Sequence, residues 1–255
     1  MAGDDRGDIE MVAGWLREAR SVVVLTGAGI STESGIPDFR GPNGVWTKDP
    51  GAEKRATLQH YLANRDARVQ GWQNRLGSTM RDAEPNAGHR ALAELEAKVK
   101  LQMLVTQNID GLHLKGGTSP ERFIEIHGNV REFRCMNCTD RGSIERVLDR
   151  VRAGEEDPPC RSCGGILKTA TISFGQSLVR EDLERAEAAA MGCDLFMAIG
   201  TTLGVYPAAG LPAAALRYGA RLVILNDAET PFDQVAHAIF REPIGVVLPE
   251  IVALV

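Results

Sequence analysis

The stretch VVVLTGAGISTESGIPDFRG, residues 22–41, decides the fold class of this 255-residue chain. It opens with an apolar, β-branched run that predicts a buried strand, and Gly27 and Gly29 then supply the first two glycines of a G-x-G-x-x-G turn. Thr32 stands where the third glycine belongs, and no acidic residue ends a second strand about 20 positions later. The pattern therefore argues against an ordinary NAD oxidoreductase.

A helix beginning at Ile30 or Ser31 would direct free backbone N–H groups at a pyrophosphate, because helix N-termini attract anions. The two glycines would let the backbone come close to that group. The same turn is also typical of a tight strand-to-helix connection that binds nothing. The turn by itself predicts either structure.

Further apolar runs have the character of buried parallel strands, and amphipathic patterns separate them. The predicted strands are residues 21–27, 101–107, 194–200 and 221–227. The predicted helices are residues 9–19, 87–97, 180–190 and 207–218. This alternation predicts an open α/β sheet.

Two segments interrupt the alternation. Residues 48–85 are polar with a helical pattern, and residues 132–169 hold two cysteine pairs but too few apolar side chains for a core of their own. We therefore expect one Rossmann-like domain built from residues 1–47, 86–131 and 170–255. The first interruption would be a helical insertion and the second a metal-binding module.

Charge and composition exclude several classes of protein. The chain has 29 basic and 34 acidic residues and no long block of either sign, which argues against direct nucleic-acid binding. No run of 18 apolar residues occurs, and the start MAGDDRGDIE is acidic and polar, so we expect neither a membrane span nor a signal peptide. A cytoplasmic protein without a membrane partner is the expectation.

The cysteines predict a metal site. Cys135-x2-Cys138 is followed after 21 residues by Cys160-x2-Cys163, a spacing typical of a tetrahedral zinc site with four thiolates. Such a site has no open coordination position, so the single ion would be structural. Four free thiols are the alternative, and Cys193 is expected to be a small core residue.

Polar motifs follow the predicted strands at their carboxyl ends. They are TQNIDGLH (106–113), GTTLGVYPAAG (200–210) and LND (225–227), and EIHGNV (125–130) comes soon after the first. Open α/β sheets present their ligand crevice at this edge. The motifs together therefore favour a ligand site over a plain turn.

These motifs, together with GIPDFRG and PNAGH, resemble the sirtuin family of NAD-dependent protein-lysine deacylases from about Arg20 to Asp227. The resemblance implies an α/β fold with an inverted Rossmann-like open parallel sheet and a small inserted zinc-binding and helical domain. It implies NAD as cofactor, and acyl-lysine proteins or peptides as partners. The acyl group would pass to ADP-ribose with release of nicotinamide.

The resemblance also assigns roles to residues. His127 would be the general base, a task that suits a side chain with a pKa near neutrality. Asn108 would contact the ribose or a water, and Asp110 would hold the nicotinamide carboxamide. The positions assigned to the cofactor are Gly27, Ala28, Gly29, Ser31, Asp38, Phe39, Arg40, Gln107, Ile109, Gly200, Thr201, Thr202 and Asn226. The other histidines, His60, His89, His113 and His237, receive no role.

The implied peptide site lies between two loops, where the substrate adds as a strand. The matching positions are Phe174, Gly175, Gln176, Gly204, Val205 and Tyr206. Gln176 replaces the family's usual glutamate, which weakens a preference for basic residues beside the lysine. Thr202 replaces the usual serine.

The acyl preference is the open part of the prediction. Family members that remove succinyl or malonyl groups carry an alanine, a tyrosine 16 positions later and an arginine three beyond; this chain has Ala56, Trp72 and Arg75. Arg75 could bind an acyl carboxylate, but Trp72 lacks the phenolic hydroxyl. A packed Trp72 beside a solvated Arg75 is the alternative. Acetyl-lysine is the default substrate, with succinyl, malonyl or lipoyl-type groups and mono-ADP-ribosyl transfer as alternatives.

Overall fold

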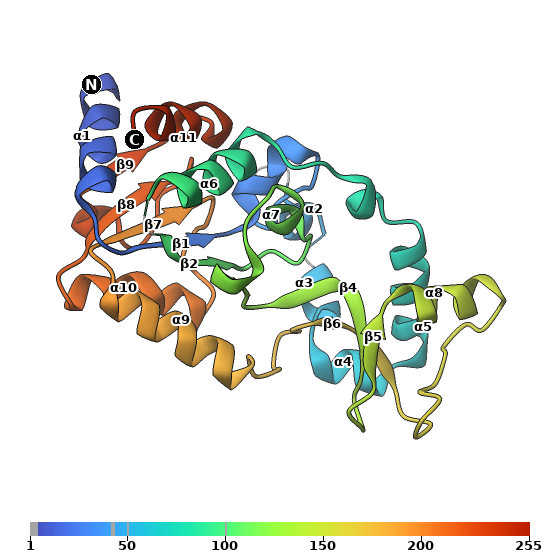
Figure 1. The fold of residues 1–255 in the computed structure, drawn as a ribbon. Helices are drawn as coiled ribbons and strands as arrows, with labels where there is room; N and C mark the ends of the chain where they lie inside the picture. The colour runs from blue at the N-terminus through green and yellow to red at the C-terminus, as the bar shows by residue number, and fades with distance from the viewer. Residues whose placement is uncertain (1–4, 42–43, 50, 100) are drawn as a thin grey trace.

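A computed structural model describes residues 5–41, 44–49, 51–99 and 101–255. The central sheet has six parallel strands in the order β3-β2-β1-β7-β8-β9 (Figure 1). The strands are β1 (Val22–Thr26), β2 (Leu101–Thr106), β3 (Phe123–Glu125), β7 (Leu195–Ile199), β8 (Arg221–Leu225) and β9 (Ala238–Phe240). All four predicted strands are confirmed, and the α/β fold with them.

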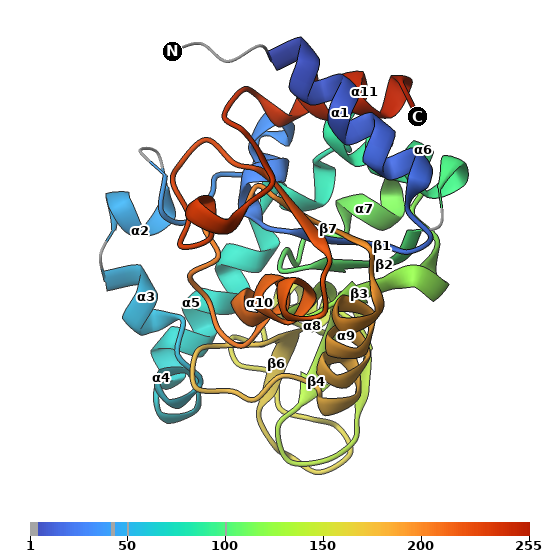
Figure 2. The same ribbon diagram turned by 90° about the vertical axis from the view of Figure 1, so that its left-hand side faces the viewer.

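Helices cover both faces of the central sheet (Figures 1 and 2), and successive side chains of the central strands pack into opposite helical layers. Val22 and Val24 pack against α1, α6 and α11, whereas Val23 and Leu25 pack against α9 and α10. The bounds are α1 (Asp5–Glu18), α6 (Ala87–Lys98), α9 (Arg180–Gly192), α10 (Leu211–Arg217) and α11 (Ile244–Ala253). Because both faces are covered, every residue of β1 is buried, as its unbroken apolar run predicts.

The first interruption is helical, as predicted. Its elements are α3 (Gly51–Arg55), α4 (Leu58–Ala63), α5 (Arg65–Leu76) and the 3₁₀ helix η2 (Thr79–Asp82), and α2 (Val45–Lys48) begins three residues before residue 48. Asn64 begins α5 by accepting a hydrogen bond from the backbone N–H of Ala67. Thr57 begins α4 in the same way, by accepting from His60.

The second interruption contains a separate antiparallel sheet in the order β5-β4-β6. Its elements are β4 (Gly128–Cys135), β5 (Arg141–Ser143), α8 (Glu145–Arg152) and β6 (Leu167–Thr171), so the sheet extends slightly past residues 132–169 at both ends. Trp72 of α5 is 1% exposed and packs in one cluster with Phe133, Leu148 and Leu167. The two interruptions therefore share one small core, which explains how so few apolar residues suffice.

The remaining short elements connect these layers. They are η1 (Ala28–Ser34), α7 (Leu112–Lys115), η3 (Pro120–Arg122), η4 (Ala208–Gly210) and η5 (Asp233–Val235). Cys193 is buried in the core beside α9, as predicted. Within the described residues, no helix is both long enough and apolar enough to span a membrane.

Candidate active site

The strand order reverses direction at β1, whose neighbours are β2 and β7. The crevice of an open α/β sheet lies at such a switch point, beyond the carboxyl ends of the strands. Two backbone hydrogen bonds join the loops there: Gly27 N–H donates to Ile199 O at 3.0 Å, and Gly29 N–H donates to Gly200 O at 2.8 Å. The structure thus brings the two glycine-containing motifs together.

The helix after β1 differs from the prediction. η1 is a 3₁₀ helix that begins at Ala28, and no α-helix begins at Ile30 or Ser31. The glycines also have a role within the protein, because a Cβ atom on Gly27 would lie 2.7 Å from Gly200 O and one on Gly29 would lie 2.7 Å from Gly200 Cα. They permit close approach of the two loops, and the N–H of Gly29 is already used by Gly200.

A compact hydrogen-bonded cluster lies beside this turn. Ser31 Oγ donates to Asp110 Oδ2 at 2.8 Å, and Asn108 Nδ2 donates to Ser31 Oγ and to Gly27 O, both at 3.0 Å. The backbone N–H of Leu112 donates to Asp110 Oδ1 at 2.8 Å. Three residues predicted to contact the cofactor are therefore held in fixed orientations by one another.

Two histidines that received no role in the sequence lie against this cluster. His89 Nε2 is 3.5 Å from Ser31 Oγ, and His113 Nε2 is 2.9 Å from Thr26 Oγ1. Their rings are 4.8 Å apart, and both are almost fully buried. Burial lowers the pKa of His89 to about 4 and lowers the pKa of His113 well below its usual value. Both imidazoles are therefore neutral at pH 7.

Local sequence signals explain where these two histidines lie. Asn86 caps α6 and forms a capping box with His89, so the PNAGH motif positions that ring. His113 lies in α7 directly after the TQNIDG turn. The capping box can be detected in the sequence, but the contact of His89 with Ser31 depends on long-range packing.

His127 lies after β3 and is half-buried. Its Nδ1 donates to Gln107 O at 3.1 Å, and its own backbone carbonyl accepts from Ile172 N–H at 2.7 Å. A protonated Nδ1 leaves Nε2 of the neutral ring with a free lone pair. Burial lowers the pKa of His127 below its usual value, so the neutral form predominates at pH 7.

Gln107 links His127 to the loop after β7. Its side-chain Nε2 donates to Thr201 Oγ1 at 2.9 Å, and Thr201 Oγ1 in turn accepts from the backbone N–H of Leu203. Beyond this loop, Gly204 is exposed and Val205 is half-buried. The neighbouring Thr202 is half-buried, and Tyr206 is 71% exposed.

Other predicted residues lie at the edges of this network. Ile109 O accepts from the backbone N–H of Val130, and the Asn226 amide donates to Ala228 O. Ala28 is half-buried in η1. Asp38 Oδ1 accepts from Gly41 N–H at 3.1 Å, which shapes the loop that carries Phe39 and Arg40.

The predicted peptide loop is tied to the helical insertion. Phe174 N–H donates to Ala56 O at 3.2 Å, and Leu58 N–H donates to Phe174 O at 2.9 Å. Gln176 Oε1 accepts from Ser173 N–H at 3.2 Å, so this side chain folds back on its own loop. Gly175 adopts a positive φ of 78° at the turn between them.

The four predicted metal ligands meet as expected. The Sγ atoms of Cys135, Cys138, Cys160 and Cys163 all lie within 4.8 Å of one another. The Cys135–Cys163 and Cys138–Cys160 sulfur separations are 3.6 and 3.7 Å, close to the ~3.8 Å edge of a tetrahedron with Zn–S bonds of ~2.3 Å. The donor set and geometry fit one structural zinc ion.

Trp72 and Arg75 lie on α5 in different surroundings. Trp72 is packed in the small core, as the alternative interpretation predicted, but Arg75 is mostly buried, with Tyr61 and Arg81 nearby. Burial lowers the pKa of the Arg75 guanidinium. Within the described residues, Trp72 Nε1 and Arg75 Nε are buried without a hydrogen-bond partner.

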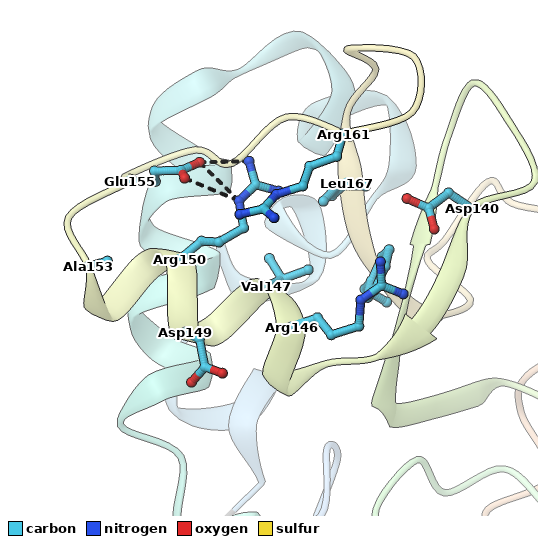
Figure 3. Close-up of a pocket in the computed structure, with 10 residues that line it drawn as sticks. Asp140, Arg146, Val147, Asp149, Arg150, Ala153, Glu155, Arg161 and Leu167 are labelled. Carbon is cyan, nitrogen blue, oxygen red and sulfur yellow. Dashed lines mark hydrogen bonds and ion pairs between the residues drawn. The ribbon is translucent and has the colours of Figure 1, made fainter.

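A cavity of about 390 Å³ lies in the small domain beside α8, away from the hydrogen-bonded cluster of Ser31, Asn108 and Asp110 (Figure 3). Arg146, Arg150 and Arg161 line it, and so do Asp140, Asp149 and Glu155, so the charges of the lining balance. Arg150 binds Glu155 at 2.6 Å, as the dashed lines of Figure 3 show. The lining therefore has no net formal charge.

Comparison with known proteins agrees with this geometry. Residues 27–207 match the model of the Sir2 family. The chain is 49% identical over 228 residues to NAD-dependent protein deacetylase 2 of Streptomyces coelicolor, covering 89% of this chain and 95% of that protein. It is 43% identical over 249 residues to NAD-dependent protein deacetylase 1 of Bradyrhizobium diazoefficiens, covering 96% and 95%.

Solved structures give the same result. A complex of Sir2 with a p53 peptide and NAD⁺ matches with a TM-score of 0.86 at 33% identity, covering 96% of this chain and 97% of that one. Fold and cysteine cluster define a Rossmann-like α/β protein with a zinc module. Within that class, the chain belongs to the Sir2 family.

Proposed function

We propose that this chain is an NAD-dependent protein-lysine deacylase with acetyl-lysine as its default substrate. The observation that carries the proposal is His127, whose Nδ1 is bonded to Gln107 O while Nε2 has no hydrogen-bond partner among the residues that the structure describes. NAD, when bound, supplies the ADP-ribosyl acceptor for the acyl group and nicotinamide as the leaving group. The relatives named as NAD-dependent deacetylases support the assignment.

In this proposal His127 Nε2 takes the proton from a ribose hydroxyl. A base must be unprotonated at working pH, and burial favours the neutral form of His127. The bond to Gln107 fixes the tautomer, while the bond from Ile172 to the His127 carbonyl fixes the backbone. The ring is therefore oriented before the substrate arrives.

Ser31, Asn108 and Asp110 would hold the nicotinamide end of the cofactor. Both carboxylate oxygens of Asp110 already accept hydrogen bonds, from Ser31 Oγ and from Leu112 N–H. Such a carboxylate keeps a fixed orientation and retains lone pairs for the amide of nicotinamide. Neutral His89 and His113 add no competing positive charge.

The remaining predicted contacts surround these groups. Gly27, Gly29 and Gly200 would shape the phosphate site, and Thr201, Thr202 and Asn226 would contact ribose or adenine. Phe39, which is 43% exposed, would cover the reacting ribose carbon, with Asp38 and Arg40 on the same loop.

The peptide would pair with the two exposed loops. Phe174 already uses its N–H and its carbonyl on Ala56 and Leu58, so the contacts fall on its neighbours Gly175 and Gln176. Gly204 and Val205 would form the opposite side. Recognition through backbone groups tolerates many peptide sequences.

The test is mass spectrometry of one peptide carrying acetyl-, succinyl- or lipoyl-lysine, incubated with and without NAD. We expect NAD-dependent loss of the acetyl group together with nicotinamide and O-acetyl-ADP-ribose. His127→Ala should abolish turnover, whereas the matched variant His237→Ala should retain it. Consumption of NAD with every peptide intact would refute deacylation and favour ADP-ribosyl transfer or NAD hydrolysis.

A dicarboxylic acyl group is the second candidate substrate. Trp72 Nε1 and Arg75 Nε are buried donors without partners among the described residues, and burial, together with the nearby charges of Arg134 and Arg75, lowers the pKa of Lys168 to about 8. Unpaired N–H donors on a guanidinium and an indole favour a carboxylate as their partner. Arg75→Met should lower kcat/KM for succinyl-lysine by roughly 10- to 100-fold, since hydrogen bonds to charged groups contribute about 1.5–3 kcal/mol. An equal loss of kcat/KM for acetyl-lysine would exclude a role of Arg75 in binding the acyl carboxylate.

We further propose the domain division given by the sequence, with residues 48–85 and 132–169 inserted in one NAD-binding domain. The separate sheet and the shared small core support it. A cytoplasmic location is also proposed, since four thiolates kept for zinc fit a reducing compartment.

A further inference from the structure

The loop that carries Phe39 and Arg40 is held by its own backbone. Val45 N–H donates to Asp38 O at 2.9 Å, and Trp46 N–H donates to Phe39 O at 3.0 Å. Gly44 permits this approach, because a Cβ atom there would lie 2.5 Å from the carbonyl carbon of Phe39. Trp46 is thereby fixed beside the residues proposed to cover the cofactor.

The Trp46 ring lies between the cofactor loop, which carries Phe39, and the peptide loop, which carries Phe174. Its centroid is 4.8 Å from that of Phe39 and 5.4 Å from that of Phe174, with tilted ring planes. The Arg40 guanidinium carbon lies 4.5 Å from the same ring centroid. Each distance is within the range of favourable aromatic or cation–π contacts.

Backbone hydrogen bonds fix the position of Phe174 in this group of aromatic rings. Both its backbone groups are bonded to the helical insertion, at Ala56 and Leu58. A displacement of the peptide loop would therefore be transmitted through Phe174 to Trp46, and from there to Phe39 and Arg40. No other route through aromatic contacts joins these loops within the described residues.

We propose that Trp46 is a positioning residue that couples occupancy of the peptide loop to affinity at the cofactor loop. The inference rests on the proposed function, because the two loops have those roles only if the chain binds an acyl-lysine peptide and NAD. A peptide strand beside Phe174 restricts that ring, and the restricted ring holds Trp46 and Phe39 in place over the cofactor. By thermodynamic linkage, the cofactor must tighten peptide binding by the same factor.

Calorimetry with ADP-ribose, which cannot react, tests this coupling. The Kd of ADP-ribose is measured with and without a saturating acetyl-lysine peptide. The Kd of the peptide is measured with and without ADP-ribose. In the wild-type protein we expect the peptide to tighten ADP-ribose about three- to tenfold, the size of one or two aromatic contacts. Trp46→Leu should reduce the factor to less than about twofold, and Trp46→Phe should restore most of it.

Trp15→Leu is the matched control, since Trp15 also lies under an arginine, Arg221 at 5.0 Å, but belongs to α1 and packs against a different core cluster. In Trp15→Leu the peptide should tighten ADP-ribose binding by the same factor as in the wild-type protein. Coupling that survives in Trp46→Leu, or two ligands that bind the wild-type protein independently, would overturn the inference and leave the proposed function intact. Absence of any peptide binding to the wild-type protein would overturn both, and the separate peptide titration identifies that case.

Discussion

Acid should destabilise this protein through its buried histidine pair. Burial lowers the pKa of His89 to about 4 in the folded chain, against about 6.5 when unfolded. Between these values the unfolded chain binds the proton and the folded chain does not. The stability contributed by a neutral His89 is therefore fully present above pH 6.5 and is lost as pH falls from 6.5 toward 4.

The size of the effect follows from the two pKa values. Lowering the pH from 7.5 to 5.5 should reduce the free energy of unfolding by about 1.4 kcal/mol through His89 alone. His113, whose pKa is also lowered by burial, acts in the same direction and adds to the loss. At pH 5.5 protons also compete with zinc for the thiolates, but the variant and the wild type keep the same four cysteines, so this competition affects them equally.

The assay is urea unfolding at both pH values for the wild type and for His89→Gln. The variant loses packing at either pH, but the stability gap between wild type and variant should narrow by about 1.4 kcal/mol at pH 5.5. His60→Gln removes a histidine outside the pair and serves as the control. A stability gap between wild type and His89→Gln that does not change with pH would mean that burial does not hold His89 neutral.

Four further outcomes are expected. Trp72→Ala should cost about 3–5 kcal/mol in urea unfolding and Trp72→Phe much less, because the ring fills the small core; a loss under about 1 kcal/mol would contradict that packing. Gly29→Ala should weaken ADP-ribose binding more than tenfold in calorimetry, because its Cβ would lie 2.7 Å from Gly200 Cα, while Gly192→Ala, with nothing within 4 Å, should bind normally. Zinc removal by a chelator should release one ion per chain and abolish the near-ultraviolet circular dichroism of Trp72; a preserved signal would show that the small core folds without metal. The acid limb of kcat/KM should report a pKa below 6.5 for His127, and a limb above 6.5 would contradict its burial.

The elements predicted from the sequence are those with long apolar runs or a long amphipathic pattern. All four long strands and the helices between them lie within a few residues of their predicted bounds. Strands β3 and β9 have three residues each, too short to show a period. Helix α11 was missed because IGVVLPEIVA is apolar almost throughout and contains Pro249, a pattern that does not show an amphipathic face.

The site was predicted from motifs, and its internal contacts were not. Ser31 and Asp110 are 79 positions apart, and only the packed sheet brings them within 2.8 Å. The type of helix after Gly27 was also beyond sequence reasoning, because Gly200, the residue directly after β7, shapes that turn. Trp46 carried no motif of its own, and its contacts depend on the approach of two loops.

The shared small core has a consequence for biosynthesis. Trp72 is made first, and its packing partners Phe133 and Leu167 lie far downstream in the chain. At ordinary rates of translation, roughly 5–20 s separate Trp72 from Leu167 as they leave the ribosome. During that interval a large indole ring on α5 has no core to enter and stays exposed in the nascent chain, until the second cysteine pair emerges and zinc can close the module.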